Sequence, residues 1–392
     1  MRVGTVRVKA AGQRGGEAAR KQSISQLPLL PSGPAAPPPR LPVLDERPSR
    51  NARFIGLTVN SVLNTPAATK MGFWSINPYV GCEFGCHYCY ARETHRWVLE
   101  RQRGSGAERP QGNGTPDGPG SATHLPRRPA APLSTEEAFE KEILVKTNVA
   151  EVLARTLNPA RVAGHSLVIG TATDPYQPAE RQFRLTRRIL EVLQSYHGLS
   201  IEIITKSSLV TRDLDVLQSL SSQNDVTVNI SLATADPRLA RLLELRSPVP
   251  AARLRALQRL NQGGIYAGLL VAPIVPGVTD DWAGLARLLE AEREAGARYV
   301  VGSALRLGPA ARHRFLPFLA REFPALAERY RRHYAGKDHV DQSYQDALDR
   351  RLRLLKQTFG FSVEEGVRRR RRLEGRLPRT ETAVAVEQEI LL

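Results

Sequence analysis

The chain has 392 residues, of which 41% are hydrophobic, so it can bury a sizeable core, and collagen-like, fibrous and fully disordered classes are excluded. Lys and Arg number 56 against 39 Asp and Glu, which gives a formal net charge of +17 at pH 7. The longest apolar run, 265–278, is interrupted by Gly268, Pro273 and Pro276 and is shorter than the ~20 residues of a membrane-spanning helix. Residues 1–16 carry scattered charges and no continuous apolar stretch, so we expect no secretory signal and a cytoplasmic protein.

Three segments lack the periodicity of packed secondary structure. Residues 1–50 are rich in Ala, Pro, Arg and Gly and predict a disordered basic arm. Residues 104–132 are rich in Gly and Pro and predict a flexible insertion. A block of arginines at 368–372 predicts a solvated tail. We therefore expect an arm over 1–50, a folded domain over 70–335 that carries the insertion, and a helical extension with an Arg-rich tail over 336–392.

Between these segments, short runs rich in Val and Ile alternate with longer stretches in which Leu recurs at helical spacing. This alternation is typical of βα units, whose parallel strands are joined by right-handed crossovers, and it predicts an α/β barrel or an open α/β sheet. In the helix expected at 280–295, Trp282, Leu285, Leu288 and Leu289 share one face, which we expect to be buried. The expected strands are 74–80, 166–170, 200–205, 226–232, 265–274 and 299–305. The expected helices are 90–100, 147–157, 184–196, 211–220, 250–262, 280–295, 310–334 and 342–357.

Polar residues gather where the expected strands end. The cysteines follow the first strand, and Thr173 and Asp174 follow the second. Lys206 follows the third strand, and Ser231 lies near the end of the fourth. Because the carboxyl ends of parallel strands meet at one edge of a sheet or barrel, we expect these side chains to face one cavity.

The three cysteines of the chain, Cys82, Cys86 and Cys89, fall within eight consecutive residues. An odd and clustered trio does not make a disulfide framework, whereas the spacing C-x3-C-x2-C places three thiolates around one point. Thiolates are soft ligands that suit iron–sulfur clusters or zinc, and a [4Fe–4S] cluster held by three cysteines has one iron without a protein ligand. The residues alone leave two readings open: an iron–sulfur cluster, or a zinc site with His87 or another residue as the fourth ligand.

The motif NPYVGCEFGCHYCYAR at 77–92, with Tyr88 as the aromatic residue before the last cysteine, resembles the radical S-adenosylmethionine (SAM) superfamily. The wider patterns GTATDPYQPAE, ITKS and APIVPGVTD resemble its spore photoproduct lyase branch, often labelled DNA repair photolyase-like. This resemblance, over about residues 70–335, implies a partial (β/α)6 barrel with a [4Fe–4S] cluster ligated by Cys82, Cys86 and Cys89. It also implies that SAM chelates the remaining iron and is reductively cleaved to a 5′-deoxyadenosyl radical, which abstracts hydrogen from a substrate.

The resemblance further implies contacts to SAM from the strand ends. Tyr88 matches the residue that packs on the adenine, and Thr173, Asp174, Lys206 and Ser231 match polar contacts to the methionine and ribose parts. Three of these have structural alternatives, because Asp174 can cap a turn, Lys206 can lie in a solvated loop and Ser231 can be a small core residue. The partner implied by such chemistry is an electron donor such as a flavodoxin or a ferredoxin.

One departure from the spore photoproduct lyase pattern lies at the end of the second strand. Those lyases carry an additional cysteine there, which returns a hydrogen atom to the product radical. Here the segment reads Gly170-Thr171-Ala172-Thr173 and has no thiol. The resemblance therefore predicts the fold and the formation of a radical, but a DNA-lesion substrate does not follow from it, and no motif names a substrate.

The basic segments point to a second class of function. Residues 350–379 hold 11 basic and 3 acidic side chains, a balance of +8 that could neutralise the phosphates of a nucleic acid. Arg246 and Arg306 are further candidates for binding an anion, although a chain this rich in Arg produces such candidates by chance. The competing hypothesis is therefore a non-catalytic, zinc-stabilised module that binds nucleic acid. Metal content and SAM turnover distinguish it from a radical SAM enzyme.

Overall fold

The computed structural model describes residues 52–69, 72–94 and 135–362. The expected basic arm at 1–50, the insertion at 104–132 and the arginine block at 368–372 lie outside the described residues. Within the described ranges, no helix has the length and apolar composition needed to cross a membrane.

A seven-stranded sheet forms the centre of the fold, in the order β10-β9-β8-β7-β6-β3-β2. Six of these strands are parallel and follow one another in chain order, while β2 pairs antiparallel with β3 at one edge. Because the two edge strands do not pair with each other, the sheet is an open (β/α)6 unit, which confirms the predicted fold class. The strands are β2 (Leu63–Asn64), β3 (Trp74–Ile76), β6 (Ser166–Ile169), β7 (Ser200–Thr205), β8 (Asp225–Ser231), β9 (Tyr266–Ile274) and β10 (Val300–Ala304).

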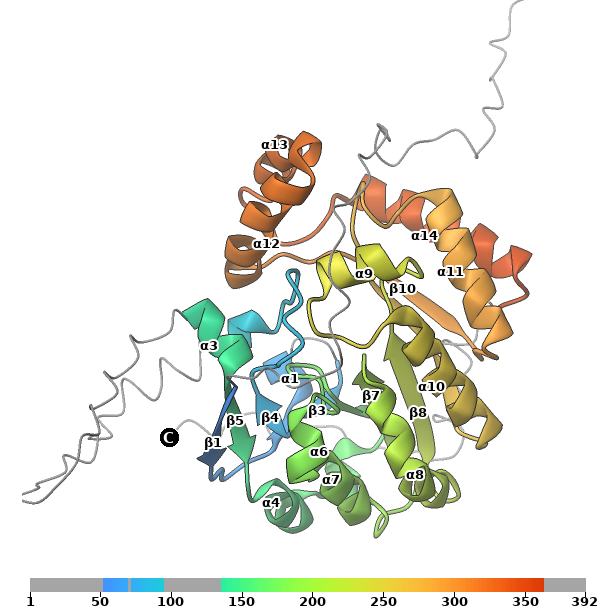
Figure 1. Cartoon of the computed structure of the whole chain (residues 1–392). Helices are drawn as coiled ribbons and strands as arrows, with labels where there is room; N and C mark the ends of the chain where they lie inside the picture. The colour runs from blue at the N-terminus through green and yellow to red at the C-terminus, as the bar shows by residue number, and fades with distance from the viewer. Residues whose placement is uncertain (1–51, 70–71, 95–134, 363–392) are drawn as a thin grey trace, which may run out of the picture.

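Helices lie between successive strands and cover the outer face of the sheet (Figure 1). Within the part of the chain that the structure describes, three helices follow the last strand; α12 and α13 form a pair at the top of Figure 1, and α14 packs beside α11. The predicted helical C-terminal part is therefore confirmed, and its helices lie outside the (β/α)6 unit. The described helices are α1 (Pro66–Thr69), α3 (Thr135–Lys141), α4 (Val149–Thr156), α5 (Pro159–Val162), α6 (Ala179–Phe183), α7 (Leu185–Leu193), η2 (Ser208–Asp213), α8 (Leu214–Ser221), α9 (Pro237–Leu243), α10 (Pro250–Gln262), α11 (Trp282–Glu294), α12 (Pro309–Glu322), α13 (Pro324–His333) and α14 (Gln342–Thr358).

The two faces of the main sheet differ in polarity because successive side chains of a strand point to opposite faces. Ile201 and Ile203 are fully buried in the core that the sheet shares with its helices. Glu202 lies on the opposite face, as do Asn229 and Ser231 two strand positions apart on β8. The inner face therefore carries polar groups, whereas the helix-covered face is apolar.

A second sheet was missed by the sequence analysis. It has the order β1-β5-β4, with β1 (Arg53–Leu57), β5 (Glu142–Lys146) and β4 (Tyr79–Val80). The single strand expected at 74–80 is wrong, because it is divided into β3 and β4 at Asn77 and Pro78, and the two parts join different sheets. Pro78 has no N–H to donate to a strand ladder, and Asn77 instead accepts a hydrogen bond from the backbone N–H of Ala172 at 2.8 Å.

Two further expectations differ from the structure. The helical stretch expected at 310–334 is two helices, α12 and α13, because Pro324 occupies the first position of the second helix and cannot continue the first. On α11, Leu285, Leu288 and Leu289 are buried as expected, but Trp282 is 46% exposed. Trp282 is the first residue of that helix, so the buried face begins one turn later.

Gly170 sets the turn that leaves β6 toward the polar strand ends. Its φ is +99°, and a Cβ placed on it would lie 2.4 Å from the carbonyl oxygen of Ile204. We expect Gly170→Ala to lower the free energy of unfolding in urea by about 2 kcal/mol or more, from left-handed strain and the clash together. Gly198→Ala is the matched control, since its φ is +74° and nothing lies within 4 Å of the added Cβ. Equal losses for the two variants would show that the contact with Ile204 costs nothing.

Candidate metal centre and cofactor site

The loop that carries the cysteines, residues 81–89, is fixed to the strand ends by hydrogen bonds. The backbone N–H of Cys82 donates to the carbonyl of Phe139, at 2.9 Å, on α3 (Thr135–Lys141). The Thr173 hydroxyl donates to the carbonyl of Gly81 at 2.6 Å, and the N–H of Glu83 donates to Gln177 Oε1 at 3.0 Å. Thr173, one of the expected SAM contacts, thus also ties the second strand end to this loop.

The segment after α9 holds the other side of the loop. Cys86 and Glu244 form an isolated antiparallel β-bridge, and the N–H of His87 donates to the carbonyl of Leu243 at 3.1 Å. Cys86 Sγ lies 3.8 Å from the hydroxyl oxygen of Ser247. A segment more than 150 residues later in the sequence therefore determines where Cys86 lies.

The thiols of the three cysteines interact with one another electrostatically. Cys82 and Cys86 are buried and Cys89 is half-buried. Burial raises the pKa of the Cys82 thiol, and Asp174, Cys89 and Cys86 raise it further. Burial also raises the pKa of Cys86 to about 12, against the opposing effect of Lys206. A cation bound by these sulfurs would reverse both effects, because it stabilises the thiolate.

Lys206 and Asp174 lie beside the cysteine loop. The Lys206 ammonium lies 5.8 Å from the centre of the Tyr88 ring. Burial alone would lower its pKa, but Cys86 and Glu244 raise it above its ordinary value. Asp174 accepts hydrogen bonds from the Thr205 hydroxyl at 2.6 Å and from the backbone N–H of Lys206 at 2.7 Å. Asp174 therefore performs the turn-fixing role that was its structural alternative, and it positions Lys206.

Tyr88 is part of a buried polar network that the sequence did not reveal. Its hydroxyl donates to Glu244, whose other carboxylate oxygen pairs with Arg253. Burial alone would raise the pKa of Glu244, but the Arg253 guanidinium and the Lys206 ammonium hold it below its usual range. Arg253 also donates to the backbone carbonyl of Ser231 at 2.9 Å, so the network reaches the fourth strand end. The Ser231 hydroxyl itself donates to the carbonyl of Ala272 at 3.2 Å.

His87 and Arg246, two further candidates from the sequence, both contact other side chains or backbone groups of the protein. The His87 ring stacks on Phe318 of α12, with 4.1 Å between ring centres, and burial lowers its pKa to about 3. Arg246, a candidate for binding an anion, instead donates to the carbonyl of Glu83 and to Glu140. Glu140 also pairs with the buried Arg92, so these groups form a charged layer behind the loop.

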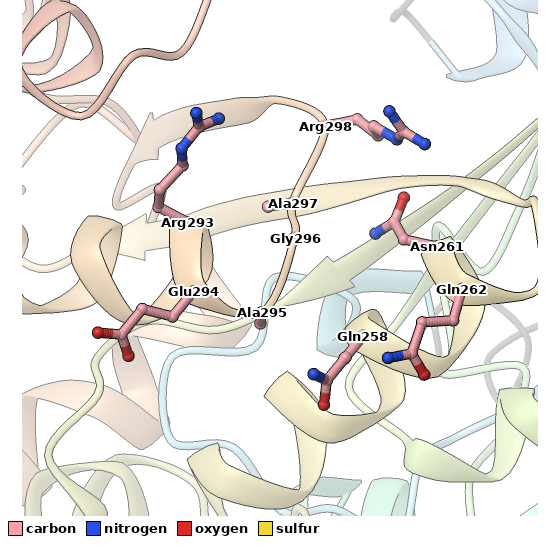
Figure 2. Close-up of a pocket in the computed structure, with 9 residues that line it drawn as sticks. All are labelled: Gln258, Asn261, Gln262, Arg293, Glu294, Ala295, Gly296, Ala297 and Arg298. Atoms are coloured by element: carbon pink, nitrogen blue, oxygen red, sulfur yellow. The ribbon is translucent and has the colours of Figure 1, made fainter.

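Two cavities lie at opposite ends of the sheet. One of about 480 Å³ lies beside the cysteine loop and is lined by residues that include Tyr90, Lys146, Thr171 and Arg306. A larger one of about 700 Å³ lies between the ends of α10 and α11 and the residues that lead into β10 (Figure 2). Ligand sites of open α/β sheets lie at the carboxyl ends of the strands, so the cavity of about 480 Å³ is the functional candidate. Thr173, Asp174, Lys206 and Ser231 do not line it, so the expectation that these side chains face one cavity is not confirmed.

Comparison with known families identifies the fold and its chemistry. A model described as the radical SAM superfamily matches residues 76–289, which is more than half of the chain and contains the cysteine loop. The chain belongs to the radical SAM superfamily. Membership implies SAM and a [4Fe–4S] cluster, and it supports SAM-dependent radical chemistry.

Relatives of this radical SAM protein occur in bacteria and archaea. An uncharacterized protein of Mycobacterium tuberculosis is 32% identical over 313 residues, covering 78% of this chain and 82% of its own. An uncharacterized protein of Methanocaldococcus jannaschii is 27% identical over 205 residues, covering 52% of this chain and 61% of its own.

Solved structures of spore photoproduct lyase share the fold. A mutant with bound dinucleoside spore photoproduct has a TM-score of 0.52 at 14% identity, covering 78% of this chain and 79% of the other. Another mutant, with bound AdoMet and the same dinucleoside, has a TM-score of 0.50 at 16% identity, covering 73% of this chain and 74% of the other. These likenesses confirm the predicted spore photoproduct lyase-like architecture.

The cysteine loop of this radical SAM protein fits an iron–sulfur cluster in its donor set and surroundings. Across the described ranges, no group of three or more His, Cys, Asp or Glu side chains is gathered closely enough to hold a metal ion. Gly81 and Gly85, with φ of +90° and +67°, give the loop turns that only glycine adopts easily. Three soft thiolates on one loop suit an iron–sulfur cluster.

Several residues of the site gave no signal in the sequence. Glu244, Arg253 and Ser247 lie in helical or loop segments without a motif, and only the three-dimensional structure brings them to Cys86 and Tyr88. Tyr90 was visible as the residue after the last cysteine. Its hydroxyl donates to the carbonyl of Thr171, so it joins the cysteine loop to the second strand end.

Proposed function

We propose that this protein is a radical SAM enzyme in which Cys82, Cys86 and Cys89 hold a [4Fe–4S] cluster. When bound, the cluster would supply the electron that cleaves SAM into methionine and a 5′-deoxyadenosyl radical for hydrogen abstraction from a substrate. The observation that carries this proposal is the single loop with three thiols, braced from α3, the second strand end and the segment after α9.

The residues around the loop would bind and orient SAM. Lys206 offers an ammonium group to a carboxylate, and Asp174 fixes the backbone that presents it. Tyr88 offers a ring for the adenine, held by its hydroxyl bond to Glu244. Thr173 and Ser231 are the remaining proposed polar contacts to the methionine and ribose parts. The fixed backbone around these groups would reduce the entropy lost when SAM is ordered.

The proposal extends to lyase-like chemistry and to partners. The spore photoproduct lyase structures bind a dinucleoside, and the net charge of +17 of this chain would favour a nucleic acid. The segment Gly170-Thr171-Ala172-Thr173 has no thiol at the strand end where those lyases carry their additional cysteine, so the hydrogen-return step of spore photoproduct repair is not part of the proposal. Reductive cleavage needs an external electron, so we include a donor such as a flavodoxin or a ferredoxin.

The test is anaerobic reconstitution of the full chain with iron and sulfide, followed by SAM and a strong reductant. We expect iron and sulfide in near-equal amounts and the appearance of 5′-deoxyadenosine and methionine. A protein that instead holds one tight zinc ion and leaves SAM intact would contradict the proposal and favour the zinc-stabilised alternative.

Lys206→Ala should weaken SAM binding without removing the cluster. Losing one charged hydrogen-bond donor costs about 1.5–3 kcal/mol, so we expect the Kd for SAM to rise by about tenfold to a hundredfold. Equilibrium dialysis with labelled SAM gives the Kd, and iron content gives cluster loading. Lys141→Ala is the control, because the side chain of this lysine is 39% exposed and pairs with Glu137 four residues away on α3. Unchanged SAM affinity in Lys206→Ala would remove Lys206 from the SAM site.

A further inference from the structure

The cavity beside the cysteine loop is a pocket with both polar and apolar lining, and several separate parts of the chain contribute to it. Its volume of about 480 Å³ is in the range of pockets that hold small-molecule ligands. Tyr90 contributes from the end of the cysteine loop and Thr171 from the second strand end. Lys146 ends β5, in the small second sheet, and Arg306 follows β10. The pocket therefore adjoins the proposed radical source but is lined in part by segments outside the (β/α)6 unit.

Two cations on the pocket wall lack a carboxylate partner among the described residues. Lys146 is half-buried, and burial alone lowers its pKa to about 8, with no charged group contributing. Arg306 is exposed, and it makes no ion pair or hydrogen bond within the described ranges. A half-buried ammonium without a counter-charge is costly, and an anionic ligand would offset that cost.

The other polar groups of the pocket already bond to protein. Glu93 accepts a hydrogen bond from the backbone N–H of Ala310 at the start of α12, and Asp338 lies 3.7 Å from Arg312. Tyr90 and Thr171 bond to each other. Both acids of the pocket thus have a protein donor, whereas Lys146 and Arg306 have no carboxylate partner among the described residues.

We propose that this pocket binds the substrate through an anionic group, a phosphate or a carboxylate, which Lys146 and Arg306 hold. The description of this ligand as the substrate rests on the proposed function, whereas the anion site itself stands on the pocket's own residues. Lysine and arginine both donate charge-assisted hydrogen bonds to anionic oxygens, and two such donors that line one pocket favour anions over neutral ligands. The substrate class is therefore a small anionic molecule or an anionic segment of a larger one.

The experiment is a binding measurement on the full chain that needs no SAM cleavage. Only eight of the 56 basic residues are lysines, so ¹³C-methylation of lysine gives few NMR signals, and Lys146→Arg assigns the one from Lys146. Inorganic pyrophosphate and succinate serve as separate probes in 0.15 M salt. We expect one of them to shift the Lys146 signal saturably, and the responding probe tells whether the pocket takes phosphate or carboxylate.

Substitutions of Lys146 and Arg306 test whether these two side chains bind the probe. By calorimetry with the responding probe, Lys146→Gln and Arg306→Gln should each weaken binding by about tenfold or more, while Lys146→Arg retains most of it. Lys141→Gln, five residues earlier and exposed, is the control that should leave binding unchanged. The proposal is overturned if neither probe shifts the Lys146 signal, or if the Gln variants bind as the unaltered protein does.

The outcome separates this inference from the proposed function. If the probes bind as expected but reconstituted protein leaves SAM intact, the anion site stands and the radical chemistry fails. If SAM is cleaved but Lys146 and Arg306 do not affect binding of either probe, the radical chemistry stands and the anion site fails.

Discussion

Cys86→Ala should abolish both cluster loading and SAM cleavage. Cys86 is the most enclosed of the three proposed ligands, 6% exposed, with the β-bridge to Glu244 fixing its backbone. A [4Fe–4S] cluster with only two cysteine ligands would be held too weakly to survive purification. We expect iron per chain after reconstitution to fall by about tenfold or more and 5′-deoxyadenosine to become undetectable. Cys82→Ala and Cys89→Ala should behave in the same way.

The controls for Cys86→Ala separate ligand loss from misfolding. The far-UV circular dichroism and the thermal midpoint should change little, because the main sheet and its helices form a core apart from the cysteine loop. Ser247→Ala removes the 3.8 Å contact to Cys86 but keeps all three thiols, so it should retain iron. Full cleavage of SAM by any cysteine variant would exclude that cysteine as an essential ligand.

Glu244→Ala should cause the largest loss of stability of any substitution near the site. The carboxylate joins the Tyr88 hydroxyl to the Arg253 guanidinium, and both ionic side chains are 1–2% exposed. Removing one partner of a buried ion pair leaves the other charge uncompensated, at a cost of about 3–5 kcal/mol. Urea denaturation should show this loss. Iron loading should also fall, since the backbone of Glu244 pairs with that of Cys86.

Two further variants serve as comparisons for Glu244→Ala. Glu151→Ala removes an ion pair with Arg188 whose side chains are 56% and 41% exposed, so it should leave stability unchanged. Glu244→Gln keeps the shape and one hydrogen-bond acceptor, and its loss should be smaller than that of the alanine variant. A stability of Glu244→Ala equal to that of Glu151→Ala would show that the buried network contributes nothing.

The sequence was most informative where one local property decided the structure. Strand β7 lies where the sequence predicted it, since its residues alternate between the core and the inner face. Helix α10 also has the predicted bounds, since Pro250 marks its first turn. The family was recognisable from the sequence because its motif, with all three cysteines, lies in the one continuous segment 77–92.

The sequence could not reveal contacts that depend on distant segments. The three-stranded sheet pairs Arg53 with Glu142, 89 residues apart, and neither five-residue strand has a pattern that stands out from loop sequence. Arg246 looked like a candidate for an anion, but the fold pairs it with Glu140. Conversely, the sequence analysis did not identify Lys146 as a candidate, because no neighbouring residue indicates that it lines a pocket together with Arg306.

The residues that fix the cysteine loop in place are synthesised long after the loop itself. Cys86 precedes Ser247 by 161 residues, and Tyr88 precedes Glu244 by 156. A ribosome that adds about 5–20 residues per second needs about 8–32 s to cover 161 residues, so the thiols emerge well before their supports. During that interval the nascent chain presents three unprotected cysteines. Metal insertion is therefore best timed after translation has passed Arg253, when the loop can take its final shape.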